Sequence, residues 1–127
     1  MASNLNNDSL VFVYGTLRKG ACNQIQMLSA ECLGLYETLP EYSMFDLGAF
    51  PAVKPLGNTS IIGELYLVNQ QTFTNLDLLE GYPTYYDRIQ IDTPKGEAWM
   101  YVMNKLPATE SVIESGDWIK YCDINSR

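Results

Sequence analysis

Residues 10–20 read LVFVYGTLRKG, and this stretch decides how the fold begins. The run 10–14 is rich in β-forming residues, which predicts a short buried strand. Gly15 stops the run and Gly20 ends the loop after it. Glycine lets a backbone approach a ligand closely, and successive N–H groups in such a turn can hold a small anion such as a carboxylate. An ordinary tight turn is the alternative, since the loop lacks the glycine patterns that bind phosphate.

Two helices are predicted further along the chain. Apolar residues at helical spacing place the first helix over 23–31. The second covers 70–80, where Asn69 is a suitable N-cap and Gly81 a suitable end. A short aromatic segment at 116–121 is expected to pack against the rest of the protein near its C-terminus.

Short strands account for most of the remaining chain. Runs of β-forming residues between turn signals predict further strands at 33–36, 42–45, 61–68, 86–91 and 98–103. The last two are expected to form a hairpin around a turn at 94–96. Prolines between 40 and 55 favour edge strands and loops there. This order of elements predicts one α+β domain over 1–127, with a closed or curled β-barrel of short strands flanked by helices.

Composition narrows the possible partners. The length of 127 residues fits one domain of the common size of about 100–150 residues. A net charge of -7 repels nucleic-acid phosphates and anionic lipids. The polar leader 1–9 lacks the features of a secretory signal, and no run approaches the roughly 18 apolar residues of a membrane span. We therefore expect a cytoplasmic protein with no nucleic-acid or membrane partner, either a monomer or a weak homo-oligomer.

The sequence contains no histidine, which removes the usual general base and the imidazole metal ligand. Its three cysteines, Cys22, Cys32 and Cys122, have no zinc-site spacing and predict no disulfide framework. We expect them to be reduced, with at least two in packing roles. No metal site is predicted. A general base would have to be a carboxylate whose pKa is raised by an apolar setting.

Glu80 is the carboxylate that fits this requirement. At about 100° per residue it shares one helix face with the apolar residues Phe73 and Leu76. Burial and the negative end of the helix dipole both favour its protonated form. A structural role, such as an ion pair with Arg88, is the alternative. Asp77, one turn earlier, is interpreted as structural.

Two blocks of sequence together resemble the γ-glutamylcyclotransferase-like family. The first is the segment 11–20 followed by Asn23, and the second is 76–83, which reads LDLLEGYP, with Tyr86 and Arg88 just beyond it. The segment 63–66 also resembles the strand before the second block. The likeness extends from about residue 10 to 121 and is closest to the short bacterial members and to γ-glutamylamine cyclotransferase.

The resemblance implies a small β-barrel flanked by helices and an activity that needs no cofactor. Glu80 corresponds to the catalytic glutamate of the family. The residues that correspond to substrate-binding positions are Tyr14, Gly15, Thr16 and Leu17 in the first loop, and Tyr86 and Arg88 are expected beside them. The partner would be a small γ-glutamyl compound, whose own α-amine attacks the γ-carbonyl to give 5-oxoproline and a free amine or amino acid.

The sequence also raises two alternatives to this function. A binding module that has the same fold without turnover is the main alternative. A hydrolase with a serine or cysteine nucleophile is disfavoured because no imidazole is present to activate it. The substrate itself is not named by the sequence, although the region 39–56 is expected to build the leaving-group side of the pocket.

Overall fold

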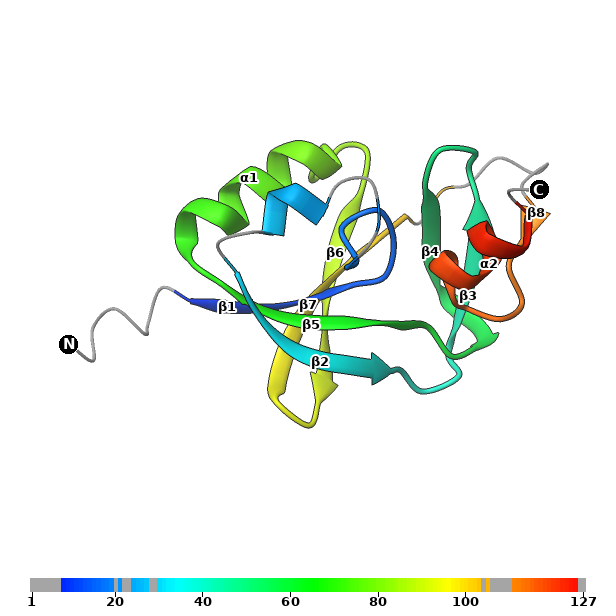
Figure 1. Ribbon diagram of the computed structural model, residues 1–127, viewed down its shortest axis with the longest axis horizontal. Coiled ribbons are helices and arrows are strands. Elements are labelled where there is room, and N and C mark those ends of the chain that lie inside the picture. The colour runs from blue at the N-terminus through cyan, green and yellow to red at the C-terminus, as the bar shows by residue number, and fades with distance from the viewer. Residues whose placement is uncertain are drawn as a thin grey trace.

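The structure, a computed structural model, describes residues 8–19, 21, 24–27, 30–103, 105 and 111–125. It is an α+β fold with a five-stranded and a three-stranded sheet (Figure 1). The strands and helices, in chain order, are β1 (Ser9–Val13), β2 (Glu31–Glu37), β3 (Tyr42–Asp46), β4 (Pro51–Thr59), β5 (Ile62–Val68), α1 (Gln70–Glu80), β6 (Asp87–Thr93), β7 (Gly96–Val102), β8 (Ser111–Val112) and α2 (Trp118–Asn125).

Strand β1 is the centre of the larger sheet, whose strand order is β2-β5-β1-β7-β6. It runs antiparallel to β5 and parallel to β7, so that Phe12 is opposite Leu65 on one side and Met100 on the other. A strand with neighbours on both sides and both faces covered reads as a continuous apolar run, as 10–14 does. Because β1 is fixed by two partners, the loop that follows Val13 starts from a rigid position.

The five-stranded sheet is not closed, and the prediction of a closed barrel is wrong. Closure requires a backbone ladder between the edge strands, and the order ends at β2 and β6 without one. These edges nevertheless approach each other, because the Tyr36 hydroxyl on β2 donates a hydrogen bond of 3.2 Å to the Asp92 carbonyl on β6. The sheet is therefore curled, with a side chain where a barrel would have paired strands.

The smaller sheet, in the order β4-β3-β8, stands at the end of the larger one, with α2 beside it (Figure 1). Strand β4 is an edge strand, as its prolines predicted. Backbone contact joins the two sheets, since the Met103 amide donates to the Val53 carbonyl at 2.9 Å. This junction lies next to the end of β1.

Helix α1 and its ends are confirmed as predicted. The Asn69 side chain accepts a hydrogen bond of 2.8 Å from the Thr72 amide, and Gly81 adopts the left-handed conformation with φ 68°. The hairpin of β6 and β7 is also confirmed. Helix α1 packs on β1 and β5 through Phe73 and Leu76.

The helix predicted over 23–31 is wrong for the part of it that the structure describes. Only a single 3₁₀ turn forms, at Gln24–Met27, and β2 already begins at Glu31. Residues 22, 23, 28 and 29 lie outside the described residues. The apolar spacing that predicted the helix spans barely two turns. Cys32, the last residue of that spacing, belongs instead to β2, which pairs with β5, and this pairing outweighs the weak local preference for a helix.

No helix in the described part of the chain is long and apolar enough to cross a bilayer. Of the cysteines, Cys32 is exposed on β2, whereas Cys122 is half-buried on α2 and packs against the core. Packing roles were predicted for at least two cysteines: Cys122 has such a role and Cys32 does not. Cys22 lies outside the described residues, so its role stays a prediction.

Candidate active site

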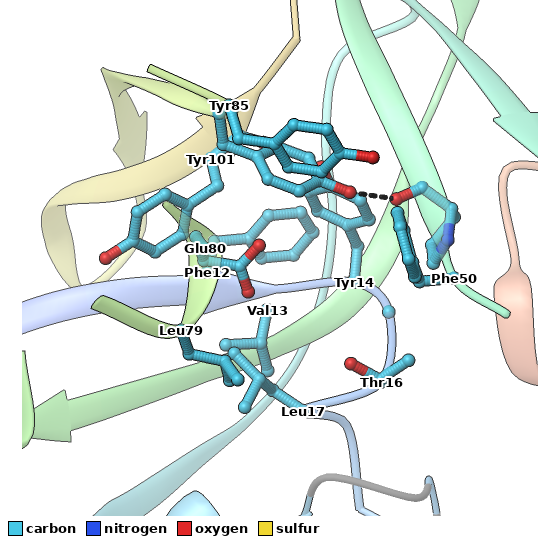
Figure 2. A pocket seen from close by; sticks show the side chains of 13 residues that line it. Phe12, Val13, Tyr14, Thr16, Leu17, Phe50, Leu79, Glu80, Tyr85 and Tyr101 are labelled. Carbon is cyan, nitrogen blue, oxygen red and sulfur yellow. Dashed lines mark hydrogen bonds between the residues drawn. The ribbon is translucent and has the colours of Figure 1, made fainter. Parts of the chain in front are cut away.

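A cavity of about 260 Å³ opens where the end of β1, the end of α1 and the start of β4 come together (Figure 2). Its lining comes from segments far apart in the sequence, namely 12–17, 50–51, 79–80, 85–86 and Tyr101. The volume is near the lower end of the range for small-molecule sites, about 300–1,000 Å³. A ligand of a few heavy atoms beyond an amino acid would fill it.

Most residues that the sequence singled out meet in this cavity. Glu80 lines it together with the first loop, which contributes Tyr14, Gly15, Thr16 and Leu17, and with Tyr86 from the segment after the helix. Arg88 is not among the residues that line the cavity. The two sequence blocks, separated by more than fifty residues, therefore form one site apart from that arginine.

Glu80 is the last residue of α1, and its carboxylate points into the cavity (Figure 2). The left-handed Gly81 ends the helix at this point, so the chain turns back and brings Tyr85 and Tyr86 over the carboxylate. Burial raises the pKa of Glu80 from 4.5 to about 7. A carboxyl group with this pKa can both accept and return a proton near neutral pH.

Three tyrosines around Glu80 direct their hydroxyl protons elsewhere. Tyr14 donates to the Tyr101 carbonyl, Tyr86 to the Pro51 carbonyl, and Tyr101 to Asp77, each at 2.7 Å. None of these protons is therefore available to stabilise the Glu80 carboxylate. Burial, followed by other neighbouring groups, raises the pKa of all three phenols, so they stay protonated at neutral pH.

Arg88 lies between α1 and β7, outside the lining of the cavity. Its guanidinium contacts both carboxylate oxygens of Asp77 at 2.9 Å. The same group lies 4.5 Å from the ring centroid of Phe73, 4.2 Å from that of Tyr82 and 4.5 Å from that of Trp99. This contact ties α1 to β6, and it gives Asp77 the structural role that the sequence suggested.

The loop after β1 is held by a buried arginine. Arg18 pairs with Glu64 on β5 and with Asp117 just before α2, both at 2.9 Å. The Lys19 amide adds a hydrogen bond of 3.0 Å to Glu64, and the Arg18 amide closes the turn onto the Gly15 carbonyl at 3.0 Å. The backbone that faces the cavity is thus fixed from behind by two separate elements.

Sequence reasoning did not identify several residues that line the cavity. Phe50 and Pro51 lie within the region 39–56, which was expected to form part of the pocket. The prolines in this region indicated turns there, but no signal pointed to these two residues. Leu79 could have been found from its place beside Glu80 on the helix. Tyr101 carried no signal, because its position depends on the parallel pairing of β7 with β1.

The fold and the cavity define a small α+β protein in which a glutamate, its pKa raised to about 7 by burial, faces a small cavity. The family described as "Gamma-glutamyl cyclotransferase, AIG2-like" matches residues 11–120. The chain belongs to this family, as the two sequence blocks indicated.

Proteins from bacteria and from mouse are similar to this chain over most of its length. A Vibrio cholerae protein, provisionally named a γ-glutamylcyclotransferase, is 47% identical over 109 residues, which cover 86% of this chain and 94% of that protein. The solution structure of the Escherichia coli family protein YtfP is 38% identical, with a TM-score of 0.73 over 88% of this chain and 97% of that one. A mouse AIG2-like protein is 25% identical, with a TM-score of 0.75 over 87% and 89% of the two chains.

Proposed function

We propose that this protein is a cofactor-independent γ-glutamyl cyclotransferase that converts a γ-glutamyl amide into 5-oxoproline and a free amine or amino acid. The observation that carries the proposal is the Glu80 carboxyl group, which faces the cavity with a pKa of about 7 opposite the loop 14–17. Membership of the family supports the same conclusion. The substrate brings its own nucleophile, so the protein needs only to fold it and to move protons.

Glu80 acts as the proton carrier in this scheme. Its carboxylate takes a proton from the substrate's α-ammonium, and the freed amine attacks the γ-carbonyl carbon to form a five-membered ring. The carbon–nitrogen bond to the leaving group then breaks as Glu80 delivers the proton to that nitrogen. Over the whole reaction the α-nitrogen loses two protons and the leaving nitrogen gains two, so no external acid or base is consumed.

The loop 14–17 is the proposed binding site for the negative charges of the substrate. Backbone N–H groups near Gly15 would hold the α-carboxylate and the oxyanion that develops on the γ-carbonyl. Thr16 faces the same space (Figure 2). Anchoring by Arg18 keeps this loop from adjusting, which lowers the cost of ordering it around the substrate.

The direct test is to incubate the purified protein with γ-glutamyl amines, γ-glutamyl dipeptides and glutathione and to assay 5-oxoproline. We expect release from at least one class of compound. Tight binding of 5-oxoproline without any turnover would instead indicate a binding module on the same fold.

The pH dependence of the reaction should follow Glu80. A general base must be deprotonated in the free enzyme, so kcat/KM should rise with pH and level off above about pH 7. Initial rates of 5-oxoproline release between pH 5 and 9 would measure this limb, with the ionisation of the substrate amine determined separately. An acidic limb near the ordinary glutamate value of 4.5 would contradict the assignment.

Replacing Gly15 by Ala should impair both catalysis and stability. A Cβ atom at this position would lie 2.8 Å from Cγ and 2.9 Å from Cδ of Pro51, so the loop and β4 must move apart. A misplacement of about 1 Å at a reacting site can cost about 100-fold in rate. We expect a loss of that order in kcat/KM, together with a lower unfolding midpoint in urea, because overpacking of this kind costs about 1–3 kcal/mol. An unchanged kcat/KM would show that the loop does not position the substrate.

A further inference from the structure

We propose that Asp77 is a positioning residue for Glu80, because it accepts the hydroxyl proton of Tyr101 and so keeps that hydroxyl from donating a hydrogen bond to the Glu80 carboxylate. The catalytic meaning of this inference rests on the proposed function, in which Glu80 is the base. The inference adds how the base is kept free to take up a proton.

The titratable side chains that face Glu80 across the cavity are all tyrosines, namely Tyr14 from the loop after β1, Tyr85 and Tyr86 from the chain after α1, and Tyr101 from β7. The start of β4 and the segment before it add no charged or titratable side chain to the described lining, and no lysine or arginine is part of that lining. Tyr85 is 55% exposed at the opening, where water can take its proton. Hydroxyl groups are therefore the side-chain donors that the Glu80 carboxylate can meet among the described residues.

Two of these hydroxyls are held by the backbone. Tyr14 donates to the Tyr101 carbonyl and Tyr86 to the Pro51 carbonyl, each at 2.7 Å. A backbone carbonyl is present whatever side chain its residue carries, so these two protons are directed by the fold. The hydroxyl of Tyr101 differs, because its acceptor at 2.7 Å is the side chain of Asp77.

The Asp77 carboxylate is fixed in the place where it accepts this bond. Nη1 of Arg88 contacts both of its oxygens at 2.9 Å. A hydrogen bond from a hydroxyl to a carboxylate is charge-assisted and about twice as strong as one between neutral groups. Figure 2 shows the result, since the ring of Tyr101 lines the cavity while its hydroxyl points away from the Glu80 carboxylate.

Without Asp77, the Tyr101 hydroxyl would need another acceptor, because Tyr101 is only 4% exposed and an unpaired buried hydroxyl is unfavourable. Glu80 is within electrostatic reach of it: burial raises the pKa of Tyr101, followed by the bond to Asp77, and the charge of Glu80 adds to the rise. A hydroxyl that donates to a carboxylate favours the charged form and lowers the pKa of the acid. Glu80 would then take a proton from the substrate ammonium less readily.

The test is an NMR titration of the Glu80 carboxyl carbon between pH 4 and 9, in protein without substrate. Asp77→Leu combined with Arg88→Met removes the acceptor without leaving the arginine charge unpaired. We expect the pKa of Glu80 to fall from about 7 to about 6 or lower in this double variant. The kcat/KM for 5-oxoproline release at pH 8 should fall with it, by up to about tenfold.

Two further variants separate this role from a structural one. Arg88→Met alone breaks the contact between α1 and β6 but leaves Tyr101 its acceptor, so the pKa of Glu80 should stay at about 7. Adding Tyr101→Phe to the double variant removes the hydroxyl and keeps the ring, which should return the pKa of Glu80 to about 7. If Asp77 only held the helix in place, Arg88→Met would disturb Glu80 and Tyr101→Phe would not restore it.

Tyr101→Phe alone leaves the ion pair intact and tests the inference even if the double variant does not fold. Its Glu80 should keep a pKa of about 7, because the hydroxyl that it lacks does not donate to Glu80 in the unaltered protein. A higher pKa in this variant would show that Tyr101 donates to Glu80 and would overturn the inference.

The double variant gives the second decisive result. A Glu80 pKa that stays at about 7 there, or that falls and is not restored by Tyr101→Phe, would also overturn the inference. The titrations need no substrate, so they decide this inference separately. Release of 5-oxoproline from none of the γ-glutamyl compounds would instead overturn the proposed function.

Discussion

Replacing Glu80 by Gln should reduce kcat for 5-oxoproline formation by about 10²–10⁴-fold, the usual contribution of a general base. Glutamine keeps the shape and polarity of the side chain but cannot accept a proton from an ammonium group. Because substrate binding depends on the loop 14–17 in the proposed scheme, KM should change far less than kcat. The measurement is steady-state kinetics at pH 8 with the best substrate of the panel.

The same variant should be more stable than the unaltered protein at this pH, which distinguishes lost catalysis from lost folding. Between pH 4.5 and about 7 the folded protein holds a proton on Glu80 that the unfolded chain has released. The free energy of unfolding therefore falls as the pH rises through this window, by up to about 3 kcal/mol, since one pKa unit corresponds to about 1.4 kcal/mol. Glutamine does not titrate, so the Glu80→Gln variant does not lose this part of the free energy of unfolding as the pH rises.

Glu97→Gln is the matched control, because it makes the same chemical change at an exposed position on β7. It should alter neither kcat nor the dependence of stability on pH. Undiminished turnover by Glu80→Gln would reject the assignment of the base. A loss of turnover accompanied by lower stability at pH 8 would show that Glu80 has a mainly structural role.

The parts of the fold that the sequence predicted are those with local causes. Helix α1 has its cap at Asn69, its stop at Gly81 and its apolar face within one segment, so propensity and packing agree. The place of Glu80 on the apolar face and at the end of the helix follows from this segment alone, whereas the cavity it faces is built by distant segments. The hairpin of β6 and β7 is likewise specified by its own turn.

What could not be predicted depends on contacts between distant segments. Whether the sheet closes is decided by how β2 and β6 meet, and neither strand encodes the position of the other. Arg88 had two carboxylates within reach on α1, and the aromatic rings of Phe73 and Trp99 around its guanidinium select Asp77. Phe73 lies on α1 and Trp99 on β7, so only the assembled fold brings both rings to the guanidinium.

Replacing Arg18 by Met should be the most destabilising substitution among those considered, with an expected loss of about 3–5 kcal/mol in the free energy of unfolding. The Arg18 side chain is 7% exposed and its partner Glu64 is 8% exposed. Without the guanidinium, Glu64 would remain buried with an uncompensated charge, and Asp117 would lose its contact with the loop. Urea denaturation followed by circular dichroism measures the change.

Neighbouring substitutions identify the cause of this loss. Lys19→Met removes the same charge from an exposed side chain and should change stability by no more than about 0.5 kcal/mol. Adding Glu64→Gln to Arg18→Met removes the stranded charge and should restore part of the stability, because the penalty comes from the unpaired carboxylate. A loss below about 1 kcal/mol for Arg18→Met, or no recovery in the double variant, would mean that packing of the loop does not depend on this ion pair. Since Arg18 follows Leu17 directly, we also expect the double variant to regain stability without regaining its original KM, because the loop that faces Glu80 would still lack its anchor.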